Sequence, residues 1–341
     1  MRILVATRDS VLVINPDLGS MERARLAADV RPTCIAADPS RLSRVWCGTR
    51  AGAVLRTDDG GATWVEASSF EGREVTALAA SPVEAGRDGA LVYAGTEPSA
   101  IFRSENGGDS WRECPGLEDL PSAESWSFPP RPETHHVRWI ACDPIRTGRL
   151  WAAIEAGALI RSRDGGETWE DRVPGGPIDT HTLATHASAP GRLYSAAGDG
   201  YFESEDGGLT WTTPEVGLEE RYLVSVAVDS GNPDTVLVSA SRGPWQAYGD
   251  GDAHSRIYRR SEGGAWKEVT AGLPPAEGRT VAYLAADPYE AGVFYAAMNL
   301  GVVRSSDGGV SWVPVPLSWP EERFGERVHA LVVVDGDRGG G

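Results

Sequence analysis

The sequence predicts an all-β fold, a seven-bladed β-propeller of four-stranded antiparallel blades. Three observations support this prediction. A phrase such as Thr57-Asp-Asp-Gly-Gly-Ala-Thr-Trp64 occurs six times, about every 40 to 55 residues, and the copy at 261–266 is shortened. Short apolar strands recur in the same order around each copy. The two ends of the chain carry complementary parts of one further repeat.

Each repeat contains four expected strands. An apolar strand ending near Asp-Pro is followed by a Val/Leu-Trp/Tyr-Ala-Gly/Ala strand, then by a Val/Ile-x-Arg-Ser strand, the phrase and a strand that begins with Trp. This order is typical of a propeller blade, in which each strand pairs with the next. Six complete blades are predicted, at about 31–68, 73–117, 135–173, 179–218, 221–273 and 279–317.

The seventh blade is expected to join the two ends of the chain. Ile3–Thr7 matches the second-strand pattern of Val45–Thr49, Val11–Ile14 matches a third strand, and 22–27 supplies a fourth. The missing first strand is Arg327–Asp335. Blade 7 therefore combines 1–28 with 327–335, which closes the ring and removes exposed sheet edges. The tail 336–341 is predicted to be disordered.

The recurring phrase resembles the Asp-box, or BNR repeat, of sialidases, xyloglucanases, sortilin-type receptors and the photosystem II assembly factor. Its aspartates are expected to accept hydrogen bonds from turn amides, with the glycines at positive φ. The expected turn residues are Asp59, Asn106, Asp164, Asp206 and Asp307. Calcium or sugar binding at these carboxylates is the alternative. The asparagine in the second copy and the shortened fifth copy favour a structural role.

The resemblance implies little about activity. Sialidases carry a Phe/Tyr-Arg-Ile-Pro signature that residues 2–9 lack, and they have six blades, so sialidase activity is not expected. Xyloglucanases place two aspartates across a cleft between two propellers, which one propeller cannot form. The photosystem II assembly factor resembles the predicted architecture more closely, as a single seven-bladed propeller with an arginine-rich face. That factor is, however, an exported or thylakoid-side protein that binds polypeptide.

Charge and hydropathy exclude several classes of partner. The net charge of −17 disfavours nucleic acid and anionic membranes. The chain starts directly with a strand, without a secretory signal, and contains no apolar run of membrane-spanning length. A cytoplasmic location is therefore expected.

Chemistry is expected on the face opposite the recurring phrases. Long insertions at 113–134, 241–255 and 314–326 fall on that face and carry aromatic residues, including Trp126 and Trp245. Long loops on a rigid scaffold commonly build binding sites. Aromatic walls suit a sugar or another flat ligand, although such side chains also serve to pin their own loops.

The innermost strands of blades 3 and 4 depart from the repeat. Blade 3 carries His136 and Arg138, and blade 4 carries Asp179 and His181 in the equivalent register. Residues two apart on a strand share a side, so we expect these four side chains to converge and to be catalytic. Short turns add Glu155 and Asp199. If a divalent metal is bound, its ligands come from His136, His181, Asp179, Glu155 and Asp199.

Arginines surround this predicted focus. Together with Trp126 and Trp245, they form the expected substrate-binding set: Arg31, Arg73, Arg221, Arg242, Arg279 and Arg327. An arginine-rich rim would concentrate an anion despite the negative net charge. Alternatively, an arginine at the start of each blade is a structural feature of the repeat.

The sequence therefore predicts a hydrolase or lyase that acts on an anionic or carbohydrate-like small molecule. The cluster suits metal-free acid/base chemistry and divalent-metal chemistry equally well. The alternative is a non-catalytic scaffold that binds an acidic peptide or protein through its arginine-rich face.

Overall fold

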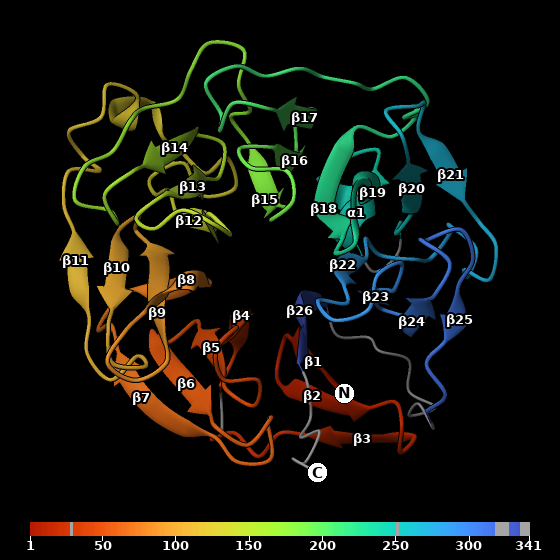
Figure 1. The fold of residues 1–341 in the computed structure, drawn as a ribbon, viewed down its shortest axis with the longest axis horizontal. Helices are drawn as coiled ribbons and strands as arrows, with labels where there is room; N and C mark the ends of the chain where they lie inside the picture. The colour runs from red at the N-terminus through yellow and green to blue at the C-terminus, as the bar shows by residue number, and fades with distance from the viewer. Residues whose placement is uncertain (28–29, 250–251, 318–326, 335–341) are drawn as a thin grey trace.

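The computed structural model describes residues 1–27, 30–249, 252–317 and 327–334, and forms a ring of seven antiparallel sheets (Figure 1). The predicted seven-bladed propeller is thereby confirmed. The predicted tail at 336–341, and most of the insertion at 314–326, lie outside the described residues.

Each blade contributes one strand to each of the three inner layers of the ring. The innermost strands are β4 (Pro32–Ala37), β8 (Glu74–Ala85), β12 (Val137–Cys142), β15 (Thr180–Thr185), β18 (Tyr222–Asp229), β22 (Tyr283–Ala286) and β26 (Val328–Val334). The second strands are β5 (Val45–Thr49), β9 (Ala90–Glu97), β13 (Leu150–Ile154), β16 (Leu193–Ala197), β19 (Asn232–Ser241), β23 (Phe294–Met298) and β1 (Arg2–Thr7). The third strands are β6 (Ala53–Thr57), β10 (Ile101–Ser104), β14 (Ala158–Ser162), β17 (Gly200–Ser204), β20 (Arg256–Arg260), β24 (Gly301–Ser305) and β2 (Val11–Asn15).

The outermost layer is less regular. Its strands are β7 (Val65–Ser69), β11 (Arg112–Cys114), β21 (Lys267–Val269), β25 (Val313–Pro314) and β3 (Ser20–Arg23). Blades 3 and 4 replace this strand with single bridges, Arg161 to Glu170 and Glu203 to Thr212. Prolines follow at 174 and 214, and proline lacks the N–H that a longer ladder needs.

The ring closes by pairing the two ends of the chain. β26 pairs antiparallel with β1, from Arg2 opposite Val334 to Ala6 opposite Ala330, in the sheet order β26-β1-β2-β3. In Figure 1 the first and last strands accordingly lie side by side. The outer strand of this blade is β3, which begins two residues before the predicted 22–27 and overlaps it at Glu22 and Arg23, because the chain pairs with β2 as early as Ser20.

The recurring phrases form hydrogen-bonded turns between third and fourth strands, here called the repeat turns. In the turn at 162–169, Asp164 accepts hydrogen bonds from the amide and hydroxyl of Thr168, at 2.9 and 2.6 Å. Ser162 accepts from the amide of Gly166 at 2.8 Å. The same set recurs at Asp59, Asp206 and Asp307. Asn106 also accepts the amide of Ser110, but its own side-chain amide donates to the Ser110 hydroxyl. These contacts explain the pattern of the phrase as local structure.

The repeat turns also join neighbouring blades. The indole of Trp46 in blade 1 donates to the carbonyl of Gly107 in the next turn at 2.8 Å, and that of Trp151 in blade 3 donates to Gly207 at 3.0 Å. The aromatic residue of the second strand is therefore a link between blades as well as part of the core.

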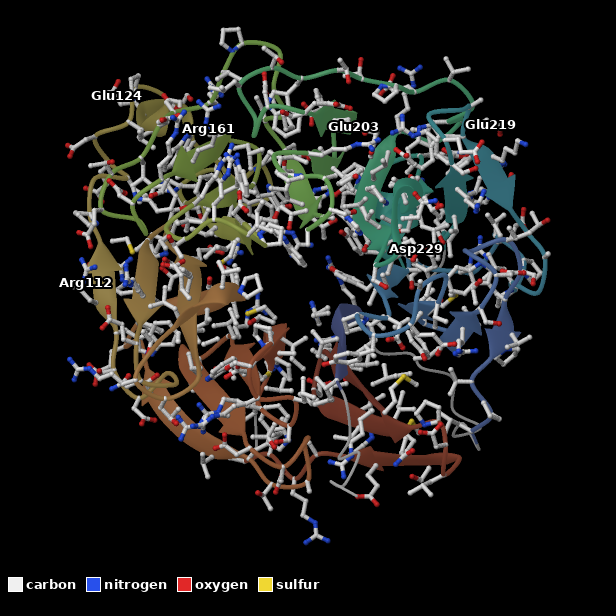
Figure 2. The ribbon with its side chains drawn as sticks, in the orientation of Figure 1. Arg112, Glu124, Arg161, Glu203, Glu219 and Asp229 are labelled. Atoms are coloured by element: carbon white, nitrogen blue, oxygen red, sulfur yellow. The ribbon has the colours of Figure 1, made fainter. Side chains whose placement is uncertain are left out.

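A buried ion pair links blades 4 and 5. Glu203 on β17 contacts the guanidinium groups of Arg192 and of Arg260 on β20, and Arg260 is 4% exposed. Figure 2 labels Glu203 where the two blades meet. Arg260 is also flanked by the rings of Tyr201 and Trp266. Burial makes this contact far more important to stability than an exposed pair.

Two short helical segments occur in the insertions. A 3-10 turn spans Ala123–Ser125, and helix α1 spans Pro244–Tyr248. Within the described ranges, no helix has the length and apolar character needed to cross a bilayer.

Candidate functional site

The innermost strands of blades 1 to 5 and of blade 7 each contain a β-bulge. Pairing with the second strand skips one residue, here called the bulge residue. The bulge residues are Thr33, Thr76, Arg138, His181, Val224 and His329. All but Val224 line a narrow cavity in the channel, with a volume of about 20 Å³.

The bulge residue has a structural task in several blades. The hydroxyl of Thr33 donates to the carbonyl of Val75 in the next blade, and that of Thr76 donates to Val137 at 2.7 Å. In blade 4 the imidazole takes over this link, because Nδ1 of His181 lies 2.6 Å from the carbonyl oxygen of Leu223. His181 therefore fulfils the structural role with one ring nitrogen and keeps the other for a different use.

The bulge also corrects the register predicted for blade 7. Aligning the innermost strands on the aspartate that ends most of them, which is Asp335 in blade 7, predicts Ala330 as the equivalent of Arg138 and His181. The pairing of Ala6 with Ala330 and of Thr7 with Val328 makes His329 the equivalent residue. This prediction is wrong by one residue, because Val334, and not Asp335, occupies the position equivalent to the aspartate that ends most of the other strands.

Glu155 lies at the centre of the predicted cluster, in the turn between β13 and β14. Its Oε2 accepts a hydrogen bond from Nε2 of His136 at 2.7 Å and lies 3.3 Å from Nε of Arg138. Its Oε1 lies 3.7 Å from Nε2 of His181. Burial alone would raise the pKa of Glu155, but the His136 hydrogen bond and the charge of Arg138 lower it to about 2. Glu155 is therefore ionised at neutral pH.

Asp179 faces the same space from the start of blade 4. Its Oδ1 accepts the amide N–H of Ala156 at 2.9 Å, and its Oδ2 lies 3.8 Å from Nε2 of His181. Ala156 has φ of 52°, a left-handed conformation that is unusual for a residue with a side chain. A Cβ at Gly198 would lie 2.0 Å from Oδ2 of Asp179, so any larger residue there would displace this carboxylate oxygen.

The predicted metal ligands divide into two groups. One oxygen each of Glu155 and Asp179 and one nitrogen of His181 lie within 4.8 Å of one another. His136 is outside this group and is hydrogen-bonded to Glu155. Asp199 receives the amide of Ile178 at 3.4 Å, and burial together with the charge of Asp179 raises its pKa. Asp199 is thus close to the cluster and electrostatically coupled to it.

The insertion at 113–134 borders the site beside blade 3. The ring of Phe128 packs edge-on against His136, with centroids 4.8 Å apart. Arg131 pairs with Glu97 at 2.7 Å, and the same Glu97 oxygen lies 3.7 Å from Nδ1 of His136. Because these contacts join residues far apart in the chain, Arg131 could not be recognised from the sequence.

Helix α1 covers the opposite side of the site. Its Tyr248 is hydrogen-bonded to Tyr222, and the Tyr222 ring packs edge-on against His181 with centroids 5.0 Å apart. The guanidinium of Arg327 stacks on the Tyr248 ring, 3.7 Å from its centroid. The second insertion thus positions aromatic residues against the cluster.

Cationic groups gather on the side of the channel formed by blades 7 and 1. Arg138 reaches across the channel and donates to the hydroxyl of Tyr283 at 3.2 Å. Burial lowers the pKa of His329 to about 3, reinforced by the positive charges of Arg327, Arg138, Arg50 and Arg8. The two sides of the channel entrance, here called the channel mouth, therefore differ in charge. Carboxylates lie toward blades 3 and 4, and guanidinium groups lie toward blades 7 and 1.

The predicted rim residues differ in their exposure. Arg279 is 2% exposed and donates to the carbonyls of Ser255 and Pro274, so it holds the second insertion in place and is closed to a ligand. Trp126 is also buried, with its indole bonded to Ser122. Trp245 on α1 is 80% exposed. The remaining arginines reach the surface or are half-buried: Arg31, Arg73, Arg221, Arg242 and Arg327.

Replacing His329 with threonine, the bulge residue of blades 1 and 2, should reduce the acid sensitivity of the fold. Because the folded pKa of about 3 lies below the usual 6.5, His329 costs no stability above pH 6.5. As pH falls from 6.5 toward 3, His329 is protonated in the unfolded chain but not in the folded chain, so the free energy of unfolding decreases. Urea unfolding at pH 7.5 and at pH 5 measures the free energy of unfolding, which should decrease less between the two pH values for His329→Thr than for the unaltered chain. Equal decreases in the two chains would contradict the lowered pKa of His329.

Comparison with known proteins places these features in context. No protein-family profile matches the chain. A curated relative, xyloglucanase Xgh74A of Acetivibrio thermocellus, is 26% identical over 281 residues, which cover 69% of this chain and 32% of that protein. The GH74 xyloglucanase from Xanthomonas campestris aligns with a TM-score of 0.70 at 18% identity, covering 92% of this chain and 52% of its own.

A second kind of structural neighbour matches nearly end to end. YCF48 bound to a D1 peptide aligns with a TM-score of 0.58 at 18% identity, covering 85% of this chain and 84% of its own. By contrast, the chain spans about a third of the curated xyloglucanase and about half of the GH74 structure. The chain is a seven-bladed β-propeller with GH74 xyloglucanases and YCF48 among its structural neighbours.

Proposed function

We propose that this propeller binds a small anionic or carbohydrate-like molecule at the channel mouth and acts on it as a hydrolase or lyase. One observation carries the proposal. Where blades 1 and 2 place threonine at the bulge, blades 3 and 4 place Arg138 and His181, and Glu155 and Asp179 converge on the free nitrogen of His181. The propeller repeat itself gives no reason for this change.

The hydrogen bond to the Leu223 carbonyl decides which nitrogen of His181 is reactive. A carbonyl oxygen only accepts, so Nδ1 carries the proton and Nε2 of the neutral ring presents a lone pair. That lone pair faces the space between Glu155 and Asp179. It is placed to take a proton from a water that attacks the substrate, or from the substrate itself.

The surrounding groups supply binding and orientation. Arg138 and the cationic side of the mouth attract an anionic group, as positive charge beside a pocket does. His136 holds Glu155 in place through its Nε2 proton. The exposed indole of Trp245 offers a flat apolar surface of the kind that stacks on a sugar ring. The similarity to xyloglucanases supports a carbohydrate-like substrate.

Oligosaccharide cleavage tests this proposal. The purified chain would be incubated with neutral xyloglucan oligosaccharides and with uronate-containing oligosaccharides, and new reducing or unsaturated ends would be measured. We expect cleavage that Glu155→Gln lowers at least 100-fold, because the Glu155 carboxylate stabilises the imidazolium that His181 becomes when it takes the proton, and a general base typically contributes 10²–10⁴-fold. Asp164→Asn, in a repeat turn on the opposite face, is the matched control and should cleave normally. Absence of cleavage, or equal cleavage by Glu155→Gln, would contradict the proposal.

A scaffold that binds an acidic peptide is the second candidate. It is favoured by the exposed guanidinium groups near the mouth, Arg8, Arg31, Arg50 and Arg327, and by the nearly full-length likeness to a peptide-bound YCF48. Fluorescence anisotropy of a labelled glutamate-rich peptide distinguishes the two. Binding that Arg31→Glu and Arg327→Glu abolish, without any oligosaccharide cleavage, would establish the scaffold function instead.

A further inference from the structure

We infer that Glu155, Asp179 and His181 form a binding site for a divalent transition-metal ion. The inference deepens the proposed function and rests on it for the metal's role, although the binding site stands on geometry alone. The three candidate ligand atoms lie within 4.8 Å of one another, on two neighbouring blades of a rigid ring. Imidazole nitrogen with carboxylate oxygen is a ligand set that suits ions such as Zn²⁺ and Mn²⁺.

Each of the three side chains is anchored through one atom and presents the other to the same space. In His181, Nδ1 is bound to the Leu223 carbonyl and Nε2 has no hydrogen-bond partner among the described residues, although the side chain is 1% exposed. Metal-bound histidines characteristically donate the second ring N–H to a carbonyl or carboxylate. The environment of His181 has this form.

The carboxylates are oriented in the same way. Asp179 uses Oδ1 to accept the Ala156 amide and leaves Oδ2 toward His181. Glu155 uses Oε2 to bind His136 and contact Arg138, and leaves Oε1 toward His181. Anchoring one oxygen fixes the direction of the other, which is how surrounding contacts hold a metal ligand in place.

The local backbone also keeps this space open. Ala156, whose amide anchors Asp179, holds a left-handed conformation with φ of 52°. Gly198 lacks the Cβ that would collide with the free oxygen of Asp179. Backbone strain in a residue with a side chain is found at functional sites more often than elsewhere. The two features preserve a position for the carboxylate that ordinary packing would not need.

A protonated His181 is the competing explanation for the convergence of two carboxylates. A proton on Nε2 would then lie between acceptors at 3.7 and 3.8 Å, which exceed the length of a good hydrogen bond. Two ligands bound to a tetrahedral ion at about 2.1 Å lie roughly 3.4 Å apart, so the two carboxylate–imidazole distances need to shorten by only about 0.3–0.4 Å. Three protein ligands also leave a coordination position for water or substrate, as in catalytic zinc sites.

Metal titration of the full chain tests the inference. Chelator-treated protein without an affinity tag would be titrated with ZnCl₂ and with MnCl₂ by calorimetry. We expect one ion per chain, and at least tenfold weaker binding for His181→Thr and Asp179→Asn. Threonine is the informative replacement, because in blades 1 and 2 it makes the same link to the next blade's carbonyl. Asp164→Asn, in an exposed repeat turn, should bind as the unaltered chain does.

Two results would overturn the inference: absence of binding in the unaltered chain, or binding that both site variants retain. Circular dichroism confirms that the variants are folded, and if either unfolds, Glu155→Gln takes its place. The outcomes separate the two proposals. Cleavage of oligosaccharide without metal binding leaves the proposed function standing with His181 as a metal-free base. Metal binding without cleavage leaves the metal site standing and removes the hydrolase or lyase function.

Discussion

Deleting residues 327–341 should abolish cooperative folding of the whole ring. The deletion removes β26, whose Val328, Val333 and Val334 are each at most 7% exposed, and leaves β1 as an unpaired inner edge. Burying three valines contributes on the order of 5 kcal/mol, comparable to the total stability of a small domain. Thermal unfolding followed by circular dichroism should show no sharp transition, and the truncated chain should aggregate through its open edge.

The shorter deletion of 335–341 is the matched control, because it ends where β26 ends. This chain should melt like the full-length protein. A synthetic peptide of residues 327–334 added to the longer deletion should restore a transition by supplying the missing strand. If the chain without β26 melts as sharply as the control, ring closure does not contribute as described.

Glu203→Ala should destabilise the protein by about 3–5 kcal/mol, the cost of leaving a buried charge without its partner. The change removes the carboxylate that contacts Arg260, which is 4% exposed and has no route to water between Tyr201 and Trp266. Arg192 keeps a partner, since it also pairs with Asp234 at 2.5 Å. Urea denaturation at neutral pH measures the loss.

An exposed ion pair provides the comparison. Arg112 and Glu167 are 52% and 47% exposed and join blades 2 and 3 at the surface, where Figure 2 labels Arg112. Glu167→Ala should cost less than about 1 kcal/mol, because water screens the pair. Similar losses for Glu203→Ala and Glu167→Ala would show that the bridge between blades 4 and 5 has no special importance.

The fold could be predicted from the sequence because local chemistry repeats in every blade. Five of the six repeat turns carry their own hydrogen-bonding aspartate or asparagine and their glycines, and the two ends match complementary parts of one repeat. The convergence of His136, Arg138, Asp179 and His181 near Glu155 was predicted for the same reason, since equivalent positions in neighbouring blades must lie side by side. The catalytic and binding roles of these residues stay predictions.

Contacts between distant segments could not be predicted. Arg138 meets Tyr283, 145 residues away, and Arg131 reaches Glu97 from the first insertion. Arg279 follows the repeat pattern, yet the second insertion covers it. His329 could not be recognised as a bulge residue, because Asp335, which follows the last residue of β26 in the sequence, suggests a register shifted by one residue. In each case the deciding contact is set by loop conformation or by a bulge, which the repeat pattern does not encode.

The position of a bound ion is the most direct test of the site. Crystals of the full chain grown with ZnCl₂ would be measured on both sides of the zinc absorption edge. We expect an anomalous peak about 2.0–2.2 Å from Oε1 of Glu155, Oδ2 of Asp179 and Nε2 of His181. An empty cluster, with peaks only at the repeat-turn carboxylates or at none of these groups, would contradict this expectation.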